Sequence, residues 1–310
     1  MKSKNTITIA APATVANLVC GFDILGMALN EPADIMKITV SDKPGLKITH
    51  TDDYGLSTVP EKNVAGVSLL AMMEELPAGT GFELEICKNI MPGSGLGSSA
   101  ASAAGAVAAA NLLLEKPFSE SDLVRFAMNG EKLASGVKHA DNIAPCISGG
   151  ITLIRSIHPL DIISLPAPPL YVTVVHPQIE VKTSDARQIL RKEVPLKNAI
   201  RQWGNIAGLV AGFMQSDYDL IGRSLEDVII EPVRSILIPG FDDVKKRCKE
   251  AGALGGGISG SGPSIFMLNK EEKTALEVRS IMEDIYNTLG IETRIYVTTM
   301  NQKGVKIIND

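Results

Sequence analysis

Three alternating glycines followed by paired serines form the part of this chain whose residue types most directly indicate chemistry. Gly93, Gly95 and Gly97 lead into Ser98 and Ser99. Glycines let the oxygens of an anion approach the backbone closely, and the free N–H groups of a helix start attract negative charge. The pattern therefore predicts a phosphate-binding loop, although a glycine-rich turn that serves only tight packing has the same composition.

The residues on either side of these glycines predict a strand before the loop and a helix after it. Phe82, Leu84 and Ile86 alternate with other residues, which is the period of a half-buried strand. The stretch 100–114 consists mainly of alanine and leucine and contains no proline, so a helix is expected to begin near Ser98. The loop would then lie at a helix N-terminus.

Two well-known phosphate loops do not fit this sequence. A Walker A loop needs a lysine before its final serine or threonine, and no lysine lies between Met91 and Glu115. A dinucleotide-binding fold needs an acidic residue after a second strand, roughly 20 residues beyond the glycines. Residues 115–120 instead read as the end of one helix and the start of another. A hydride-transfer enzyme is therefore disfavoured.

Composition and charge exclude further classes. The chain has 310 residues, with 30 Lys and Arg against 35 Asp and Glu, and its basic residues are scattered, so no nucleic-acid partner is expected. No apolar run approaches the roughly 20 residues of a membrane helix, and the first residues carry no export pattern. We therefore expect a cytoplasmic protein without a membrane partner. The cysteines and histidines are dispersed, which predicts reduced thiols and no metal site built from them.

A proline-rich stretch over residues 165–170 is the best candidate for a linker, and it divides the chain into domains 1–164 and 165–310. A second glycine cluster lies at 255–264 and leads into an apolar strand. The remaining expected strands are 6–10, 34–40, 149–154, 171–176 and 293–298, and the expected helices are 63–75, 121–135, 184–191, 200–214 and 240–251. This order suggests an α+β arrangement with helices on one face of a sheet.

Three segments in this order resemble the GHMP family of small-molecule kinases over nearly the whole chain. They are residues 11–26, the loop that begins at Pro92, and the second glycine cluster. The strings Ala16-Asn17-Leu18 with Gly21-Phe22-Asp23, His139-Ala140-Asp141-Asn142-Ile143-Ala144-Pro145 and Glu231-Pro232-Val233-Arg234 are similar to the branch of that family that phosphorylates L-homoserine. The Gly-Glu-His segment of galactokinases and the N-terminal lysine of mevalonate kinases are absent from the matching positions.

The resemblance implies an α+β, two-domain GHMP kinase fold. Its N-terminal α/β domain is related to the second domain of ribosomal protein S5 and contains a left-handed βαβ crossover, which departs from the usual hand. Its C-terminal domain is a ferredoxin-like α/β sandwich. The implied reaction is ATP-dependent phosphorylation of the side-chain hydroxyl of L-homoserine, a step of threonine biosynthesis, with Mg²⁺ as the metal. A homodimer is among the expected assemblies.

The implied nucleotide site comprises the glycine loop with its flanking residues and, earlier in the chain, Asn63. These are Asn63, Met91, Pro92, Gly93, Ser94, Gly95, Leu96, Gly97, Ser98, Ser99, Ala100 and Ala101. Asn63 resembles a residue of the adenine pocket, and a helix N-cap explains it equally well. The implied Mg²⁺ ligands are Ser98 and Glu131, and Mg²⁺ takes only one or two protein oxygens. Without the resemblance, Glu131 would read as an exposed helical glutamate.

The implied L-homoserine site comprises Asn17, Asp23, Asp141, Thr183, Arg187, Arg234 and Gly260. Arg187 and Arg234 would hold the carboxylate, because guanidinium groups pair with carboxylates bidentately. Most arginines otherwise lie on the surface, but Thr183 and Arg187 share one face if their segment is helical. An aspartate beside a glycine, such as Asp23, is otherwise most often a turn former.

The catalytic residues implied are Asn17, Asp23 and Asn142, and none of them is a strong general base. Asn142 stands where some relatives carry an aspartate, and an amide does not accept a proton usefully. Phosphoryl transfer depends mainly on positioning and charge neutralisation, so direct in-line transfer tolerates this absence. Two alternatives stay open from the sequence: a kinase of this family that acts on another alcohol such as mevalonate, and a non-catalytic binding or regulatory protein on the same fold.

Overall fold

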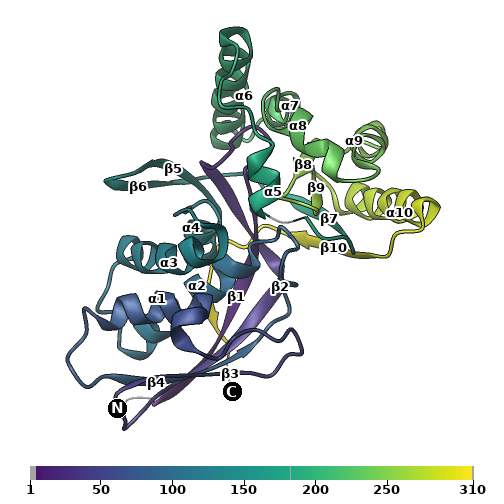
Figure 1. The fold of residues 1–310 in the computed structure, drawn as a ribbon. Coiled ribbons are helices and arrows are strands. Elements are labelled where there is room, and N and C mark those ends of the chain that lie inside the picture. Colours follow the sequence, from purple (N-terminus) through teal and green to yellow (C-terminus); the bar gives the residue numbers. More distant parts are fainter. Residues whose placement is uncertain (1–4, 182, 309–310) are drawn as a thin grey trace.

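The protein folds around two β-sheets that lie side by side (Figure 1). The structure, a computed structural model, describes residues 5–181 and 183–308, and the side chains of residues 183–185 are outside the described part. The proline-rich stretch joins the two sheets, because one strand ends at Leu165 and the next begins at Tyr171. The α+β arrangement expected from the sequence is observed.

The first sheet is built on a long hairpin of β1 (Thr6–Ala16) and β2 (Leu25–Val40), which pair with Ile9 opposite Met36. Its other strands are β3 (Gly45–His50), β4 (Gly81–Cys87), β5 (Ile151–Ile157), β6 (Leu160–Leu165) and the short β11 (Lys306–Ile307). The order is β11-β1-β2-β4-β3, and β5 pairs with both β2 and β6. β3 and β4 are parallel and are joined through the 3₁₀ turn η1 (Pro60–Lys62) and a helix, which makes them the βαβ unit of this half.

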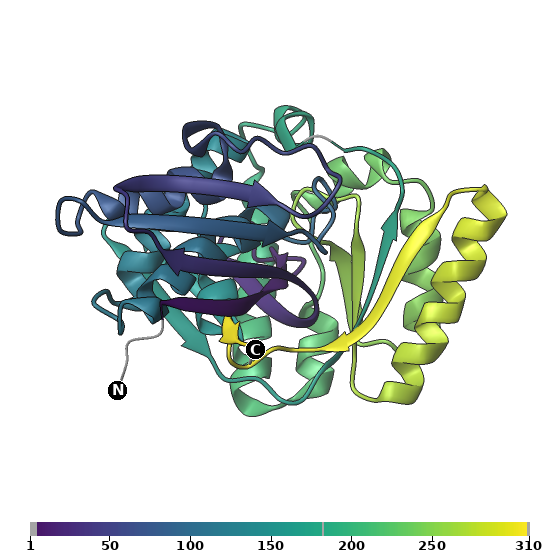
Figure 2. The same ribbon diagram turned by 90° about the horizontal axis from the view of Figure 1, so that it is seen from below.

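Four helices cover one face of this sheet: α1 (Val64–Met73), α2 (Ser98–Leu113), α3 (Glu120–Ser135) and α4 (Ile143–Ser148) (Figures 1 and 2). α2 lies among the others and is buried over almost its whole length, which explains its alanine-rich sequence. A side chain at Gly105 would meet the Met36 sulfur at 2.7 Å, so the helix lies close against β2. α3 begins with a capping box of Ser119 and Asp122.

The second sheet has the antiparallel order β10-β7-β9-β8 and carries helices on one face, the arrangement expected of a ferredoxin-like half. Its strands are β7 (Tyr171–Pro177), β8 (Gly255–Ile258), β9 (Ile265–Asn269) and β10 (Thr293–Thr299). α9 (Phe241–Glu250) and α10 (Glu272–Leu289) pack against it through residues such as Val244 and Met282. β10 then leads the chain back to the first sheet through β11 (Figure 2).

The segment between β7 and β8 contains the remaining helical elements: α5 (Thr183–Gln188), α6 (Leu196–Gln215), α7 (Tyr218–Ser224), α8 (Glu231–Arg234) and the 3₁₀ turn η2 (Ser235–Leu237). α6 is one turn longer at its start than the sequence predicts. Within the described residues, no helix is long and apolar enough to cross a membrane. The four cysteines are all free, and three of them are buried.

Candidate functional site

A cavity of about 570 Å³ lies between the glycine loop and residues of the second half of the chain. Most of the residues singled out in the sequence line it: Asn17, Asp23, Asn63, Pro92, Gly93, Gly95, Gly97, Ser98, Ser99, Glu131, Asp141, Asn142, Arg187, Arg234 and Gly260. Five others lie outside its lining: Met91, Ser94, Leu96, Ala100 and Ala101. Thr183 begins α5, but its side chain lies outside the described residues. The fold therefore gathers segments that are far apart in the sequence.

The glycine loop has the geometry of an anion site. Gly93, Gly95 and Gly97 all have positive φ angles, of 75°, 80° and 67°, a backbone region that other residues rarely adopt. Gly97 is the N-cap of α2 and provides no side chain to cap it, and the first turn of the helix contains no acidic residue. The first amides of α2 therefore keep their hydrogen-bonding capacity for a ligand at the positive end of the helix dipole.

The second glycine cluster supports this loop from the other half of the chain. The Ser259 hydroxyl donates to the Gly95 carbonyl oxygen at 2.7 Å, and the Ser264 amide donates to the Ser94 carbonyl oxygen at 3.3 Å. A Cβ at Gly95 would lie 2.6 Å from the carbonyl oxygens of both Ser259 and Gly262. A glycine is therefore required at position 95 for two reasons: the carbonyl oxygens of Ser259 and Gly262 leave no room for a side chain, and the φ angle is positive.

A half-buried carboxylate with nearby hydroxyl groups lies beside the start of α2. The Ser99 hydroxyl donates to Glu131 Oε2 at 2.8 Å, and burial raises the pKa of Glu131. The Ser98 hydroxyl donates to the Ile90 carbonyl oxygen at 2.8 Å, so its oxygen still has a free lone pair. Of the two serines, the one bonded to Glu131 is thus Ser99, which the resemblance did not assign to the metal.

Asp23, Arg187 and His139 meet at the other end of the cavity. Arg187 Nη2 lies 3.0 Å from both carboxylate oxygens of Asp23 and 2.9 Å from His139 Nε2. His139 Nδ1 lies 3.6 Å from Asp23. Partial burial lowers the pKa of His139, with Asp23 acting in the opposite direction. A neutral His139 that accepts from Arg187 through Nε2 fits these contacts.

Arg234 is buried beside this group. Its Nε donates to the Ala186 carbonyl oxygen at 2.9 Å and its Nη1 to the Gly260 carbonyl oxygen at 3.1 Å. Burial, and then the charge of Arg187, lower the pKa of Arg234 to about 10. The two guanidinium carbons lie 4.9 and 5.5 Å from the Phe22 ring, so both cations flank one aromatic side chain. Two like charges held this close are suited to share one anion.

Asn17 forms hydrogen bonds both to the second glycine cluster and to Asp23 in the turn between β1 and β2. Its amide nitrogen donates to the Gly260 carbonyl oxygen at 2.9 Å, and its oxygen accepts from the Asp23 amide at 3.0 Å. Asn17 and Asp23 both have positive φ angles, of 72° and 62°, in the turn between β1 and β2. Strain of this kind is typical of residues held in place for a ligand.

Asp141 is fully buried, and its burial raises its pKa to about 7, with Asp23 and Glu131 adding to the shift. A cation bound beside Asp141 would favour its ionised form and so lower this pKa. The neighbouring Asn142 accepts a hydrogen bond at 2.7 Å from the Thr14 hydroxyl through its amide oxygen. The Asn142 oxygen keeps a second lone pair, and its amide hydrogens can also serve a ligand.

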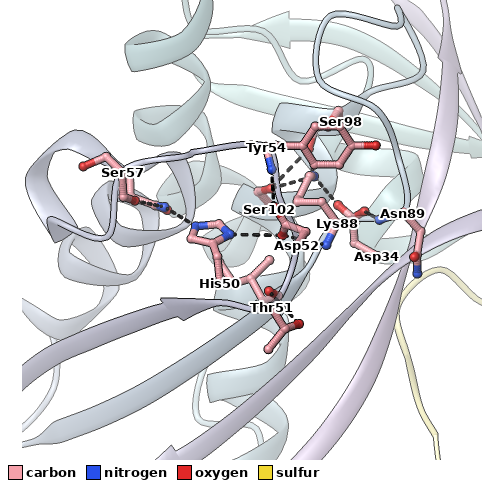
Figure 3. Close-up of polar contacts among 12 residues, drawn as sticks. Asp34, His50, Thr51, Asp52, Tyr54, Ser57, Lys88, Asn89, Ser98 and Ser102 are labelled. Atoms are coloured by element: carbon pink, nitrogen blue, oxygen red, sulfur yellow. Dashed lines mark hydrogen bonds and ion pairs between the residues drawn. The ribbon is translucent and has the colours of Figure 1, made fainter.

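Asn63 has a structural role in addition to its place at the cavity wall. Its oxygen accepts from the Gly66 amide at 3.1 Å as the N-cap of α1, and its nitrogen donates to the Ser57 carbonyl oxygen at 2.6 Å. His50 Nε2 lies 3.1 Å from the same nitrogen, and His50 Nδ1 lies 3.2 Å from Asp52 (Figure 3). The N-cap interpretation of Asn63 is confirmed, while a contact with a base stays a prediction.

An ion pair that sequence analysis missed lies beneath the loop (Figure 3). Lys88 and Asp34 are bonded directly, and their side chains are 1% and 0% exposed. The Lys88 ammonium also donates to the Ser98 carbonyl oxygen at 2.8 Å and to the Ser102 hydroxyl at 2.9 Å. Asp34 in turn accepts from the amides of residues 89 and 90, at 2.8 and 2.9 Å. The pair therefore fastens the first turn of α2 to the sheet.

Comparisons with known proteins agree with this geometry. The GHMP kinases N terminal domain matches residues 63–150 and the GHMP kinases C terminal domain matches residues 209–288. A homoserine kinase from Chloroherpeton thalassium is 45% identical and aligns over 97% of this chain and 99% of its own length. One from Methanocella arvoryzae is 40% identical over 98% of both chains. This chain belongs to the GHMP kinase family.

Solved structures of GHMP kinases show the same relationship. A crystal structure of a homoserine kinase from Cytophaga hutchinsonii superposes with a TM-score of 0.95, is 50% identical, and covers 99% of both chains. A mevalonate kinase structure is 15% identical and has a TM-score of 0.70 over 96% of this chain and all of its own, which shows the fold alone. The family and the homoserine kinase resemblance inferred from the sequence are confirmed.

The GHMP kinase cavity contains residues that the sequence left without a role. His139 begins the string that runs to Pro145, but its contact with Arg187 needs two segments 48 residues apart to meet. Phe22 belongs to the Gly21-Phe22-Asp23 string, and its contact with two arginines is equally invisible in the sequence. Lys88 directly follows β4, three residues before Met91, and so lies outside the loop in which a Walker A lysine would stand.

Proposed function

We propose that this chain transfers the γ-phosphoryl group of ATP to the side-chain hydroxyl of L-homoserine, giving O-phospho-L-homoserine. The observation that carries the proposal is one cavity with a phosphate loop at one end and two arginines with two aspartates at the other. A zwitterionic amino acid needs both a cationic and an anionic partner, and the second end provides them. The homoserine kinase relatives over nearly the full length support the same substrate.

The charges of the second end fit the two ionic groups of an amino acid. Arg187 and Arg234 would hold the α-carboxylate, which pairs with guanidinium groups through parallel hydrogen bonds. Asp141 would hold the α-ammonium group, whose charge favours the ionised carboxylate. Asn17 and Asp23 would then position the side-chain hydroxyl, since they are joined to each other and lie on the same strained turn.

The phosphate end would bind ATP through the backbone amides from Gly95 to Ser99. An oxygen-rich group beside the loop fits Mg²⁺, which prefers hard oxygen ligands and keeps several waters. Glu131 and Ser98 would hold the ion, and Ser99 would orient the Glu131 carboxylate through its hydrogen bond. Mg²⁺ would neutralise charge on the β- and γ-phosphates.

The proposed transfer is in line and needs no strong base in the chain. Asn142 offers amide hydrogens rather than a proton acceptor, because an amide is too weak a base to take up the hydroxyl proton. Those hydrogens are suited to contact the transferred phosphoryl group, whose oxygens carry the charge in a loose transition state. Holding the hydroxyl and the phosphoryl group in contact then supplies much of the acceleration.

The experiment that tests this function is a comparison of acceptors. ATP consumption is measured with L-homoserine, L-serine, mevalonate and galactose, and with L-2-aminobutyrate, which lacks the hydroxyl, as the control for ATP hydrolysis. We expect turnover with L-homoserine and a smaller rate with L-serine, whose hydroxyl is one carbon closer to its α-carbon. Turnover of mevalonate alone would indicate a kinase for another alcohol. ATP binding without turnover of any acceptor would indicate a non-catalytic protein.

A further inference from the structure

Thr14, near the end of β1, is bonded to two parts of the site from behind the cavity wall. Its amide donates to the Leu96 carbonyl oxygen at 3.1 Å, and its hydroxyl donates to Asn142 Oδ1 at 2.7 Å. A Cβ at Gly97 would lie 2.0 Å from the Thr14 hydroxyl oxygen, so a glycine leaves the room for this contact. Thr14 itself is fully buried, whereas Asn142 lines the cavity. The Thr14 hydroxyl can therefore reach a ligand through Asn142.

The course of β1 changes where it places this hydroxyl. Ala11 and Thr14 both face α2, because a Cβ at Gly105 would lie 2.9 Å from the Ala11 Cβ and Thr14 contacts Gly97 at the start of the same helix. Residues three apart in a regular strand face opposite sides of the sheet. The pairing of β1 with β2 shifts register between Pro12 and Thr14, which accounts for the change. Irregularities of this kind often lie beside functional sites, where they redirect a side chain.

The Asn142 side chain is held by Thr14 and not by its own helix. Asn142 is the N-cap of α4, a position where an asparagine oxygen commonly accepts from the first amides of the helix. Within the described residues, the Asn142 side chain makes no such cap bond, and its oxygen accepts from Thr14 instead. The oxygen end of this amide is thus directed at Thr14, and the amino group at the other end is directed away from it.

We propose that Thr14 is a positioning residue, which fixes the Asn142 amide with its amino group toward the transferred phosphoryl group. This role rests on the proposed phosphoryl transfer. The last torsion of an asparagine side chain has two broad states, which exchange the positions of the oxygen and the amino group. The amino group stabilises phosphoryl oxygens by donating to them, whereas the amide oxygen repels them. One buried hydroxyl therefore decides whether Asn142 attracts or repels the group in transfer.

The first test compares two replacements of Thr14. Thr14→Val keeps the shape of the side chain without the hydroxyl, and we expect the single-turnover rate with L-homoserine to fall about tenfold while both KM values stay within about twofold. Thr14→Ser restores the hydroxyl and is expected to return the rate to within about threefold, since serine lacks only the methyl group that restricts the first torsion. An unchanged rate in Thr14→Val, or a rate as low in Thr14→Ser, would overturn the proposal.

Thr173→Val is the matched control for a loss of stability. Thr173 of β7 is also fully buried, and its hydroxyl donates to the Ala275 carbonyl oxygen at 2.9 Å, outside the lining of the cavity. Thermal unfolding is expected to show a loss of stability in both valine variants, whereas the rate of transfer is expected to fall in Thr14→Val alone. Rate losses of equal size in the two variants would show a general effect of a weakened fold and would overturn the proposal.

The second test determines whether the effect of Thr14 passes through Asn142. Asn142→Ala removes the amide that Thr14 would orient. Adding Thr14→Val to Asn142→Ala is therefore expected to lower the single-turnover rate by less than about twofold, because residues that act through one contact are not additive. A further tenfold fall in the double variant would mean that Thr14 supports the loop by another route, and would overturn its role toward Asn142.

The third test measures the orientation of the amide without any acceptor. In protein labelled with ¹⁵N at asparagine, the side-chain amide signals of Asn142 are identified by their absence from Asn142→Ala. Order parameters and relaxation dispersion are expected to show added motion of this amide in Thr14→Val and none in Thr173→Val. An amide equally ordered in Thr14→Val would overturn the proposal. If the chain turned over no acceptor, the proposed function would fail, and this measurement would still support or overturn the positioning of Asn142.

Discussion

The two ends of the cavity are built in different ways. The phosphate end is made of backbone: a glycine loop, the start of α2 and the Ser259 to Ser264 turn, held together by hydrogen bonds at 2.7 to 3.3 Å. The amino-acid end is made of charged side chains from separate segments, such as Asp23, Asp141 and Arg187. A backbone site recognises a group common to many ligands, whereas a side-chain site can be changed residue by residue. Family members can therefore share the first end and differ in the second.

The largest effect is expected from a single methyl group in the phosphate end. Gly95→Ala places a Cβ 2.6 Å from two carbonyl oxygens at a φ of 80°, so the loop must move. Loss of its aligned donors is expected to lower kcat by about 10³-fold. Gly93→Ala is the matched control, because its φ is 75° but nothing lies within 4 Å of the added carbon. An equal loss of kcat in both variants would show that the positive φ angle determines the loop conformation, and that the contact with the carbonyl oxygens of Ser259 and Gly262 does not.

The next effect is expected in stability, beneath the same loop. Lys88→Met leaves the Asp34 carboxylate buried without its partner, which is expected to lower the free energy of unfolding by about 3 kcal/mol. The double variant Asp34→Asn/Lys88→Met removes both charges and is expected to regain most of that loss. Arg155→Met, in an ion pair whose side chains are 63% and 36% exposed, provides the control with little change. Denaturant unfolding measures all three; no recovery in the double variant would contradict a simple charge-pair role.

A smaller and more selective effect is expected from the amino-acid end. Arg187→Met removes charge-assisted hydrogen bonds and is expected to raise the KM for L-homoserine about 50-fold while the KM for ATP stays within about twofold. Arg191→Met, an exposed arginine nearby, serves as the control. Steady-state kinetics with each substrate varied in turn gives both constants. A comparable rise in the KM for ATP would mean that the two ends are not separable.

The smallest effect is expected in the pH profile. Because burial raises the pKa of Asp141 to about 7, the carboxylate that would bind the ammonium group is protonated at lower pH. kcat/KM for L-homoserine is therefore expected to fall about tenfold from pH 8 to pH 6, and Asp141→Asn to be low and flat over this range.

The same shift has a consequence for stability. A carboxyl whose pKa is raised in the folded state is least destabilising below its ordinary value and most destabilising above the raised one. Asp141→Asn is thus expected to raise the melting temperature at pH 8 and to leave it unchanged near pH 4. A gain that is the same at both pH values would exclude this titration as its cause.

The phosphate end could be predicted from the sequence because its determinants are consecutive. Alternating strand residues, glycines and an alanine-rich helix act over short range, and α2 (Ser98–Leu113) begins where the sequence places it. β2 begins at Leu25 rather than Asp34, since Pro32 interrupts the strand pattern and pairing with β1 and β5 decides its length. The start of α6 at Leu196 follows Pro195, a proline that residue periodicity alone does not use.

The amino-acid end could be found only through the family resemblance. Arg187 reaches Asp23 across 164 residues, and no local propensity encodes that contact. The buried Lys88 and Asp34 pair has the same character, because each residue alone reads as an exposed charge next to or within a strand. The assignment of the metal to Ser98 and Glu131, and the role of Thr183, stay predictions.

The short strand β11 gives the molecule an order of assembly during its synthesis. It pairs Ile307 with Ile9, and Met300 forms a further bridge with Leu29, so the last part of the chain completes the sheet that the first part begins. While the ribosome is still making the second half, Ile9 and Ala10 at the outer edge of β1 lack their strand partner, and an unpaired edge can pair with other chains. A fragment that ends at residue 164 would therefore lack the strand that pairs with Ile9 and Ala10 of β1.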